Sequence, residues 1–313
     1  MKSLLLGVPV ALGATIGGAF LLTPQREHLA PRDMPGSSQF ITVDGFTLHY
    51  TDEGPRDGVP VVLIHGFGSW AFTWRRERAA LVASGFRALA FDMLGSGASD
   101  RPEQPIYTTE LQARLILGAL MALGIDATHL IGHSYGARVS LQIALLDPGR
   151  VRSLALLAPE ALATARPPVA EWLKVPGIGY ALAFYSTAPQ LVGTGLKLVS
   201  KQHDWIAPDV IAGYAAPLAV RGSTAAQVWQ GRSPKDGARP VPQHLAEITS
   251  PTLIIWGGDD PVFPAGDGTQ LARTMPNATL KTLPGIGHIP HEEAHEEVGA
   301  LLQEWLHQAV TGF

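Results

Sequence analysis

The stretch THLIGHSYGARVSLQIALL, residues 128–146, decides the fold. Its first residues, 128–131, form a short apolar run that predicts a buried β-strand. Residues 135–146 carry apolar positions at helical spacing and are followed by Pro148-Gly149, which predicts a helix that ends there. Between the two lies Gly132-His133-Ser134-Tyr135-Gly136, a G-x-S-x-G motif. We therefore expect a strand, a tight turn that carries Ser134, and a helix.

The residues around Ser134 suit such a turn. A sharp passage from a strand into a helix leaves little room for side chains, and Gly132, Gly136 and Ala137 are all small. The turn would lift the Ser134 hydroxyl above the edge of the sheet, beside the N-terminus of the helix. A five-residue pattern also occurs in ordinary Gly-rich turns, so its meaning depends on what accompanies it.

The rest of the chain continues the same alternation of apolar runs and helical stretches. Asp44-Gly45 lies between two strand-like runs and predicts a hairpin. Further strands are expected at 59–64, 86–91, 151–157, 252–256 and 279–283, and helices at 71–83, 109–123, 269–274 and 292–309. Such an alternation predicts the α/β class, with a doubly wound, mostly parallel sheet.

The alternation of strands and helices is interrupted once, by a segment that divides the α/β domain into two parts of the sequence. Residues 160–243 are rich in Ala, Gly and Pro and lack clear strands, so they are expected to form a helical cap. The core of the α/β domain would then comprise residues 37–159 and 244–313. The 313 residues contain no cysteine, carry a net charge of −4 and have no basic stripe. This composition excludes disulfides and thiol chemistry and argues against a nucleic-acid partner.

The N-terminus carries a second kind of signal. Residues 3–22 are uncharged, and about 20 apolar residues suffice for a helix to span a bilayer. A small-x-small cleavage site is not evident after Leu22, which favours an uncleaved anchor over a signal peptide. Residues 1–36 are thus interpreted as a hydrophobic segment and linker that the α/β domain does not need for folding. The protein is expected to be membrane-anchored or exported, on the periplasmic or extracellular side.

A serine hydroxyl is a weak nucleophile unless a base removes its proton, and the base must itself be oriented. Two loops supply candidates. The expected strand at 252–256 is followed by Asp259-Asp260-Pro261, and the strand at 279–283 is followed by Pro284-Gly285-Ile286-Gly287-His288. Open α/β sheets place their sites beyond the carboxyl ends of strands, where both loops lie.

With these motifs in place, the sequence resembles the α/β-hydrolase superfamily. The matching stretches are HGFG at 65–68, DMLGSGASDRP at 92–102, GHSYG at 132–136, GGDDPVFP at 257–264 and PGIGHIPHEE at 284–293, in the order that the family has. The resemblance implies that Ser134 is the nucleophile, His288 the base and Asp260 the acid that orients it. Asp259 is a second candidate for the acid. Glu160 is a third, because some members place the acid after the strand that ends at 157.

The resemblance also implies the supporting residues. The backbone N–H groups of Phe67 and Tyr135 would form the oxyanion hole. His65, Gly66, Gly132, His133 and Gly136 would have structural roles beside it, as would the loop that begins at Asp92. This chemistry requires neither a metal nor another cofactor.

Serine at position 134 narrows the reaction. Family members that open epoxides or displace halide have Asp there, so these activities are not expected. The cap contains seven aromatic residues, including Trp172, Trp205 and Trp229, some of which are expected to face the serine. We therefore expect an apolar pocket and a carboxylesterase- or lipase-like enzyme that cleaves an uncharged, partly hydrophobic ester or acyl substrate through an acyl-enzyme. Hydrolysis of a carbon–carbon bond and cofactor-free perhydrolysis are the alternatives. The oligomeric state stays open.

Two other classes of protein compete with this interpretation. The stretch from His291 to His295 reads H-E-x-x-H, a zinc-protease pattern in which two imidazoles share one helix face. A third ligand at the usual spacing does not follow, and Glu residues are also common at the start of a helix. The other rival is a non-catalytic binding module, against which all three candidate triad residues argue.

Overall fold

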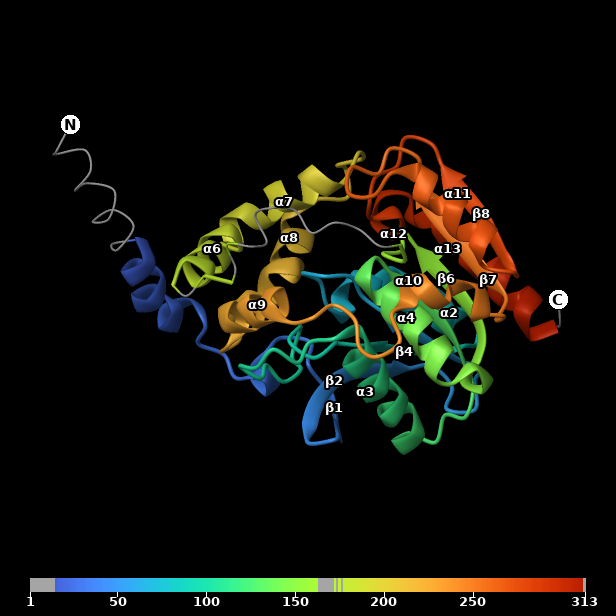
Figure 1. Ribbon diagram of the computed structural model, residues 1–313, viewed down its shortest axis with the longest axis horizontal. Helices are drawn as coiled ribbons and strands as arrows, with labels where there is room; N and C mark the ends of the chain where they lie inside the picture. Colours follow the sequence, from blue (N-terminus) through green and yellow to red (C-terminus); the bar gives the residue numbers. More distant parts are fainter. Residues whose placement is uncertain (1–14, 163–171, 173, 176, 312–313) are drawn as a thin grey trace.

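The computed structural model describes residues 15–162, 172, 174–175 and 177–311. Eight strands form one sheet in the order β1-β2-β4-β3-β5-β6-β7-β8 (Figure 1). The strands are β1 Gln39–Val43, β2 Phe46–Glu53, β3 Pro60–Ile64, β4 Arg87–Phe91, β5 Thr128–His133, β6 Val151–Leu157, β7 Thr252–Gly257 and β8 Ala278–Leu283. The pairs β1·β2 and β2·β4 are antiparallel and all other pairs are parallel. The predicted doubly wound, mostly parallel α/β fold is confirmed.

The first two strands form the predicted hairpin. Val43 pairs with Phe46, and both residues of the connecting turn have positive φ, 50° for Asp44 and 82° for Gly45. Two consecutive positive φ angles define the turn that matches the twist of a two-stranded ribbon, and Asp-Gly adopts it readily.

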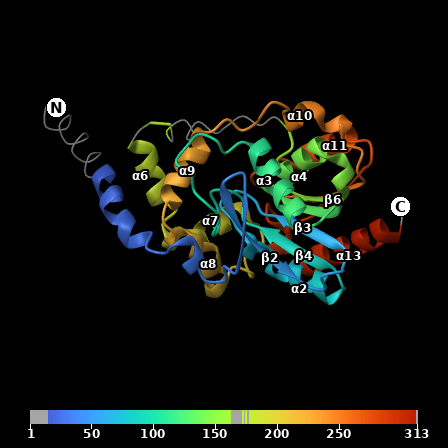
Figure 2. The same ribbon diagram turned by 90° about the horizontal axis from the view of Figure 1, so that it is seen from below.

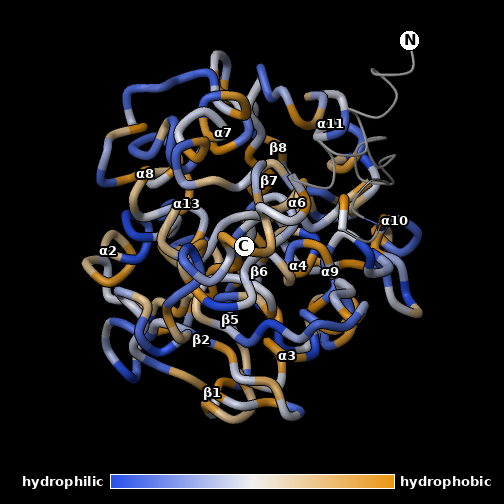
Figure 3. The backbone as a smooth tube through the Cα atoms, turned by 90° about the vertical axis from the view of Figure 1, so that its left-hand side faces the viewer, coloured by the Kyte–Doolittle hydropathy of each residue, from blue (hydrophilic) through white to orange (hydrophobic). Residues whose placement is uncertain are grey.

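The central strands are buried on both faces. Along β3, Val61 and Leu63 belong to one core cluster, whereas Val62 and Ile64 belong to another. Alternate side chains of a strand point to opposite faces, so each face of the sheet has its own core. Figure 2 shows α3 and α4 on one side of the sheet and α2 and α13 on the other. Figure 3 shows hydrophilic segments, in blue, along the outer loops of the molecule.

The helices of the core are α2 Arg75–Ala83, α3 Thr109–Ala122, α4 Tyr135–Leu146, α11 Ala265–Thr274, α12 Pro290–Glu293 and α13 His295–Thr311. Short 3-10 helices lie at Pro31–Asp33, Ala71–Trp74, Pro148–Arg150, Pro189–Leu191, Ala216–Ala219 and Leu245–Glu247. The last predicted helix is in fact two, because Ala294 has the non-helical angles φ −133° and ψ 48°. The break lets His291 and Glu292 point into the protein while His295 stays exposed.

The insertion between β6 and β7 is helical where the structure describes it. It contains α6 Ile178–Ser186, α7 Val192–Val199, α8 Pro208–Ala215, α9 Ser223–Arg232 and α10 Val241–His244. Figure 1 shows α6 to α9 side by side at one end of the sheet. Trp205 and Tyr214 pack with Ile289 of the core in a separate hydrophobic cluster. The cap is thus fastened directly to the loop that follows His288.

The N-terminal segment, residues 15–36, is packed rather than free. Residues 15–26 are helical and lie beside α6 (Figures 1 and 2). Ala19 is fully buried against Ala181 and Phe184, and Met34 is 2% exposed. A β-bridge joins Leu29 to Val220 of the cap. The segment that the sequence suggested could be left out of the fold therefore forms part of it.

Most of the apolar run at 3–22 lies outside the described residues. Within the part of the chain that the structure describes, none of the helices is long and apolar enough to cross a membrane.

Candidate active site

Ser134 occupies the strained turn that the motif predicts. It is the N-cap residue of α4, with φ 51° and ψ −116°, a conformation that side-chain-bearing residues rarely adopt. The turn is tight, because a Cβ on Gly132 would lie 2.6 Å from the Cα of Ala137. A Cβ on Gly136 would lie 2.2 Å from the carbonyl oxygen of Ile64. Both positions therefore require glycine, and both serve to bring β3, β5 and α4 together.

The three expected polar residues meet above the sheet. The Nε2 atom of His288 lies 3.0 Å from the Oγ atom of Ser134. The Nδ1 atom of His288 lies 2.8 Å from the Oδ2 atom of Asp260. This convergence follows from the register, because the carboxyl ends of β5, β7 and β8 lie at one edge of the sheet. The order serine, imidazole, carboxylate is the geometry in which a base activates a hydroxyl.

The geometry distinguishes the three candidates for the acid. Asp260 has a fully buried side chain, and its second oxygen accepts hydrogen bonds from the backbone N–H groups of Val262 and Phe263. Asp259 is exposed and instead accepts a bond from the N–H of Gly285. Glu160 pairs with Lys235. Asp260 alone of the three contacts His288.

Glu293, which the sequence analysis did not single out, holds the loop around His288. Its carboxylate accepts hydrogen bonds from the N–H groups on both sides of the histidine, at 2.9 Å from Gly287 and 3.1 Å from Ile289. One of its oxygens also accepts bonds from the N–H groups of Lys201 and Gln202 in the cap. The position of His288 therefore depends on the cap as well as on the core.

His65 and His133 are both buried near Ser134. The Nε2 atom of His133 lies 2.8 Å from the carbonyl oxygen of His288, to which it donates. Burial, with a contribution from the neighbouring His288, lowers the pKa of His133 to about 3. Burial also lowers the pKa of His65, whose Nε2 accepts a bond from the N–H of Met93. Both rings are thus neutral, and they support the site without exchanging protons in the working range.

Asp92 orders the loop that follows β4. Its carboxylate accepts hydrogen bonds from the N–H groups of Ala71 and Ala98 and contacts the Nδ1 atom of His49 at 2.7 Å. His49 was missed from the sequence, because it lies in β2 and no motif surrounds it. Residues that follow Asp92, namely Met93, Leu94 and Ser96, line a pocket at Ser134, and Asp92 itself holds this loop in place.

A pocket of about 890 Å³ opens at Ser134 and His288. Its apolar lining comes mainly from core loops, namely Phe67, Met93, Leu94, Tyr107, Val262 and Phe263. From the cap it is lined by Val199, Gln230, Gly231, Ser233 and Lys235. None of the seven cap aromatic residues is among the described residues that line it, so that expectation is wrong. Most of them instead pack the cap onto the core and the N-terminal segment, as Trp205, Tyr214 and Phe184 do.

The pocket also contains an ion pair, between Lys235 and Glu160. Burial, reinforced by the nearby guanidinium of Arg138, lowers the pKa of Lys235 to about 8. The N–H of Glu160 donates to the carbonyl oxygen of Ser134, and Lys235 accepts bonds at its own carbonyl from Thr109. The pair is therefore fixed close to Ser134 and makes part of the otherwise largely apolar pocket lining polar.

The residues assigned to the oxyanion hole are near the serine. Phe67 and Tyr135 both line the pocket, and Phe67 exposes 65% of its surface. Tyr135 is the first residue of α4, where backbone N–H groups have no partner within the helix. Such groups are available to a developing negative charge.

The H-E-x-x-H stretch does not form a zinc site here. His291 and His295 lie on two helices separated by the break at Ala294. The Nε2 atom of His291 is 2.8 Å from the hydroxyl of Thr73, and Glu292 binds Arg75 through both oxygens. Among the described residues, no group of three or more His, Cys, Asp or Glu is placed to hold a metal ion.

Comparison with known proteins identifies the family. A family model described as "alpha/beta hydrolase fold" matches residues 59–295 of the chain. That span includes the serine, the carboxylates and the histidine described above. The chain therefore belongs to the α/β-hydrolase family and is a hydrolase of that fold.

Its relatives catalyse different hydrolyses. It is 28% identical over 281 residues to the 2-hydroxy-6-oxo-6-phenylhexa-2,4-dienoate hydrolase of Burkholderia cepacia, which covers 86% of this chain and 96% of the relative. It is 30% identical over 296 residues to haloalkane dehalogenase 2 of Mycobacterium tuberculosis, covering 88% and 96%. The structure of a bacterial membrane phospholipase A matches with a TM-score of 0.73 and 26% identity, over 100% of both chains.

Proposed function

We propose that the chain is a serine esterase that cleaves uncharged, partly hydrophobic esters through an acyl-enzyme. The observation that carries this proposal is the chain of contacts from Ser134 through His288 to Asp260 at the mouth of an apolar pocket. A carboxylate that accepts from Nδ1 leaves Nε2 free to take the proton of the serine. The buried Asp260 also stabilises the imidazolium that forms when His288 takes the proton of Ser134.

The reaction would proceed in two halves. The Oγ atom of Ser134 attacks the ester carbonyl as His288 takes its proton, and the N–H groups of Phe67 and Tyr135 stabilise the oxyanion. His288 then gives the proton to the leaving alcohol as the C–O bond breaks, leaving the acyl group on Ser134. Water, deprotonated by His288, attacks the acyl-enzyme and restores the serine. Each oxyanion donor contributes roughly 10²–10³ in rate in hydrolases of this kind.

The pocket supports a hydrophobic acyl group. Its volume of about 890 Å³ lies at the upper end of the range for small-molecule sites. Eight apolar or aromatic residues of the core line it, beside the ion pair and a few polar residues such as Gln112 and Asp267. An acyl chain would remove its own surface and that of the lining from water, a gain of roughly 25 cal/mol per Å² of apolar area.

We also propose that the protein acts at a membrane, anchored by residues 3–22 or exported through them. The support is the uncharged run in the sequence and the match, over the whole of both chains, to a protein described as a membrane phospholipase A. Fractionation and N-terminal sequencing test this proposal. A chain that starts at residue 1 and resists carbonate extraction would support an anchor, whereas a soluble chain that starts after Leu22 would support cleavage.

Carbon–carbon bond hydrolysis is the second candidate. It is favoured by the similarity to the Burkholderia cepacia dienoate hydrolase. The same three residues would serve both reactions, so the substrates must distinguish them. The dienoate is coloured, and its disappearance can be followed directly.

The deciding experiment is a panel of p-nitrophenyl esters from acetate to palmitate, run beside the dienoate. The proposal predicts ester turnover with an optimum at a medium or long acyl chain, together with labelling of Ser134 by a fluorophosphonate. Turnover of the dienoate at a kcat/KM more than a hundredfold above that of every ester would favour the second candidate instead. A chain that neither turns over nor is labelled would be a non-catalytic relative.

A further inference from the structure

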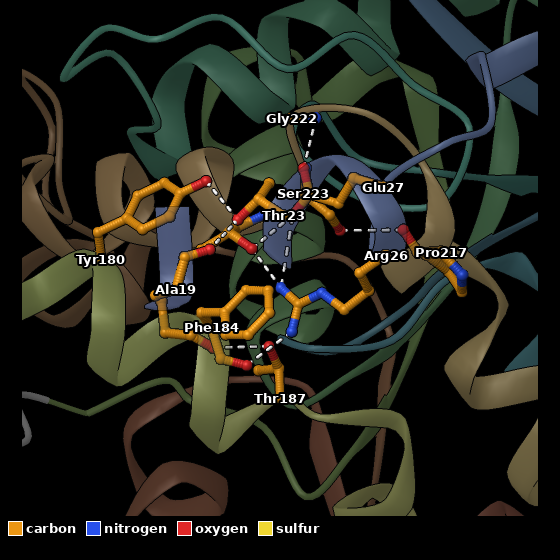
Figure 4. A network of polar contacts seen from close by, with 12 residues as sticks. Ala19, Thr23, Arg26, Glu27, Tyr180, Phe184, Thr187, Pro217, Gly222 and Ser223 are labelled. Atoms are coloured by element: carbon orange, nitrogen blue, oxygen red, sulfur yellow. Dashed lines mark hydrogen bonds and ion pairs between the residues drawn. The ribbon is translucent and has the colours of Figure 1, made fainter. Parts of the chain in front are cut away.

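Glu27 of the N-terminal segment binds the start of cap helix α9 (Figure 4). It is 5% exposed, and its oxygens accept hydrogen bonds from the backbone N–H groups of Gly222, Ser223 and Thr224 at 2.9, 3.1 and 2.8 Å. It also accepts a bond from the hydroxyl of Thr224. One carboxylate thus gathers four donors from a single turn of chain about 195 residues away.

These contacts replace a missing helix cap. The first N–H groups of any helix lack partners within it and carry a partial positive charge. The N-cap residue of α9 is Gly222, which has no side chain to accept from them and adopts φ 84°. Glu27 therefore supplies, from another part of the chain, what a capping Asp or Ser supplies locally.

The residue before Glu27 extends the same connection to α6. The guanidinium of Arg26 donates to the carbonyl oxygen of Phe184 at 2.6 Å and lies 3.9 Å above the centre of the Phe184 ring. It also contacts the hydroxyl of Thr224. The dipeptide Arg26-Glu27 thus links α6 and α9 to the N-terminal segment, as Figure 4 shows.

The other end of α9 belongs to the substrate pocket. Gln230 and Gly231 line the pocket, and the amide of Gln230 donates to the carbonyl oxygen of Gly95 in the neighbouring loop. The opposite side of α9, through Val228 and Trp229, faces a second cavity of about 570 Å³ beside the N-terminal segment. Helix α9 therefore separates the two cavities, and Glu27 fixes the turn at which the helix begins.

We propose that Glu27 is a positioning residue that sets the wall of the substrate pocket formed by α9, and thereby the length of acyl group that the enzyme accepts. The inference rests on the proposed esterase function. It assigns to the N-terminal segment a role in substrate selection and not only in attachment.

The test compares Glu27→Gln with Glu103→Gln in the full-length chain. Glu103 is exposed and lines the same second cavity, which makes it a matched control. We expect Glu27→Gln to raise KM for p-nitrophenyl dodecanoate roughly fivefold or more while kcat for the acetate stays within about twofold, since loss of a cap weakens a helix without touching the triad. Hydrogen exchange should quicken in α9 and stay unchanged in β5.

Thr224→Val, a milder change, should act in the same direction, and Glu103→Gln should do neither. The inference would be overturned if Glu27→Gln speeds hydrogen exchange in α9 but leaves the ratio of KM for the dodecanoate to KM for the acetate unchanged. It would also be overturned if exchange in α9 stays unchanged. A wild-type chain that cleaves no ester at all would instead refute the proposed function. In that case calorimetric binding of dodecanoate would decide the inference, which requires weaker binding by Glu27→Gln and unchanged binding by Glu103→Gln.

Discussion

The core loops that carry Ser134, Asp260 and His288 are built by different means from the N-terminal segment and the cap helices that it contacts. In the core, each functional side chain lies a few residues beyond a buried strand, and the sheet brings the loops together. In the second region, the decisive contacts join residues far apart in sequence, as Glu27 does with the start of α9. Short motifs can therefore describe the first region, whereas only the folded structure reveals the second.

The largest effect should come from the core. Ser134→Ala should lower kcat by roughly 10⁶, His288→Ala nearly as much, and the double variant scarcely more, because triad residues act as a unit. Steady-state kinetics with a p-nitrophenyl ester measure this, with thermal unfolding as the check that the fold persists. Losses that multiply in the double variant would contradict a shared role.

The sequence predicts the core far better than it predicts the N-terminal segment and its contacts with the cap. The strand at 151–157 and the helix at 135–146 were located to the residue, because burial on both faces and helical spacing are local patterns. The proposal of Ser134, Asp260 and His288 as a triad came from motifs in family order, and the contacts among the three residues are compatible with it. His49 and Lys235 did not emerge from motifs, because each acts through a partner that only the fold brings near. Glu293 lies close in sequence to Gly287 and Ile289, but only the fold shows that it also binds the cap at Lys201 and Gln202.

The second prediction tests which carboxylate of the core orients His288. Asp260→Asn should lower kcat by about 10⁴, since the amide favours the wrong tautomer of His288. Asp259→Asn should change kcat less than twofold, because its side chain is exposed and contacts only the N–H of Gly285. Glu160→Gln is the second control. The reverse ranking of the two Asp variants would move the acid to Asp259.

The third effect tests the N-terminal segment as a part of the fold. Deletion of residues 1–36 removes the buried Met34 and the cap that Glu27 provides. We expect it to cost roughly 3–7 kcal/mol, from the loss of a buried side chain and of a helix cap. Deletion of residues 1–14 should leave the unfolding temperature within about 2 °C of the full chain, since it spares every contact described above. Equal unfolding temperatures for the two deletions would show that residues 15–36 are a linker that does not stabilise the fold.

The fourth prediction concerns the pH dependence of stability that Glu77 causes. This residue of α2 is 4% exposed, and its Oε2 atom lacks a hydrogen-bond partner within the described structure. Burial, with repulsion from Glu292, raises the pKa of Glu77 to about 8. In the unfolded chain the carboxyl loses its proton near pH 4.5, so the folded state holds one more proton between these values and stability falls as pH rises through this window.

Glu77→Gln should therefore flatten the fall in the free energy of unfolding between pH 5 and pH 8, by roughly 2–4 kcal/mol. Urea unfolding at both pH values measures it. Glu53→Gln, at the exposed last residue of β2, is the control and should leave this dependence on pH unchanged. If the free energy of unfolding of Glu77→Gln still falls as steeply between pH 5 and pH 8, a group other than Glu77 causes the fall.

The smallest effect concerns Tyr214 of α8, where the cap meets the core. Its hydroxyl donates to Glu292 at 2.8 Å and, because its one proton is used there, accepts from the hydroxyl of Thr73 at 2.7 Å. Thr73 in turn accepts from the Nε2–H of His291, whose ring lies edge-on to His133. The chain of donors thus runs in one direction, from His291 to the carboxylate of Glu292.

Tyr214→Phe would remove the central member of that chain and leave the Thr73 hydroxyl without its acceptor. The cost should be roughly 1–3 kcal/mol, the usual penalty for a buried polar group that loses its partner. We expect kcat to change less than twofold, since His133 keeps its bond to the carbonyl oxygen of His288. Tyr185→Phe removes only an exposed hydrogen bond to the carbonyl oxygen of Thr15 and should alter kcat not at all and stability little. A tenfold loss of kcat in Tyr214→Phe without loss of stability would mean that the cap acts on the triad through this chain, and the division between the two regions would then fail at this junction.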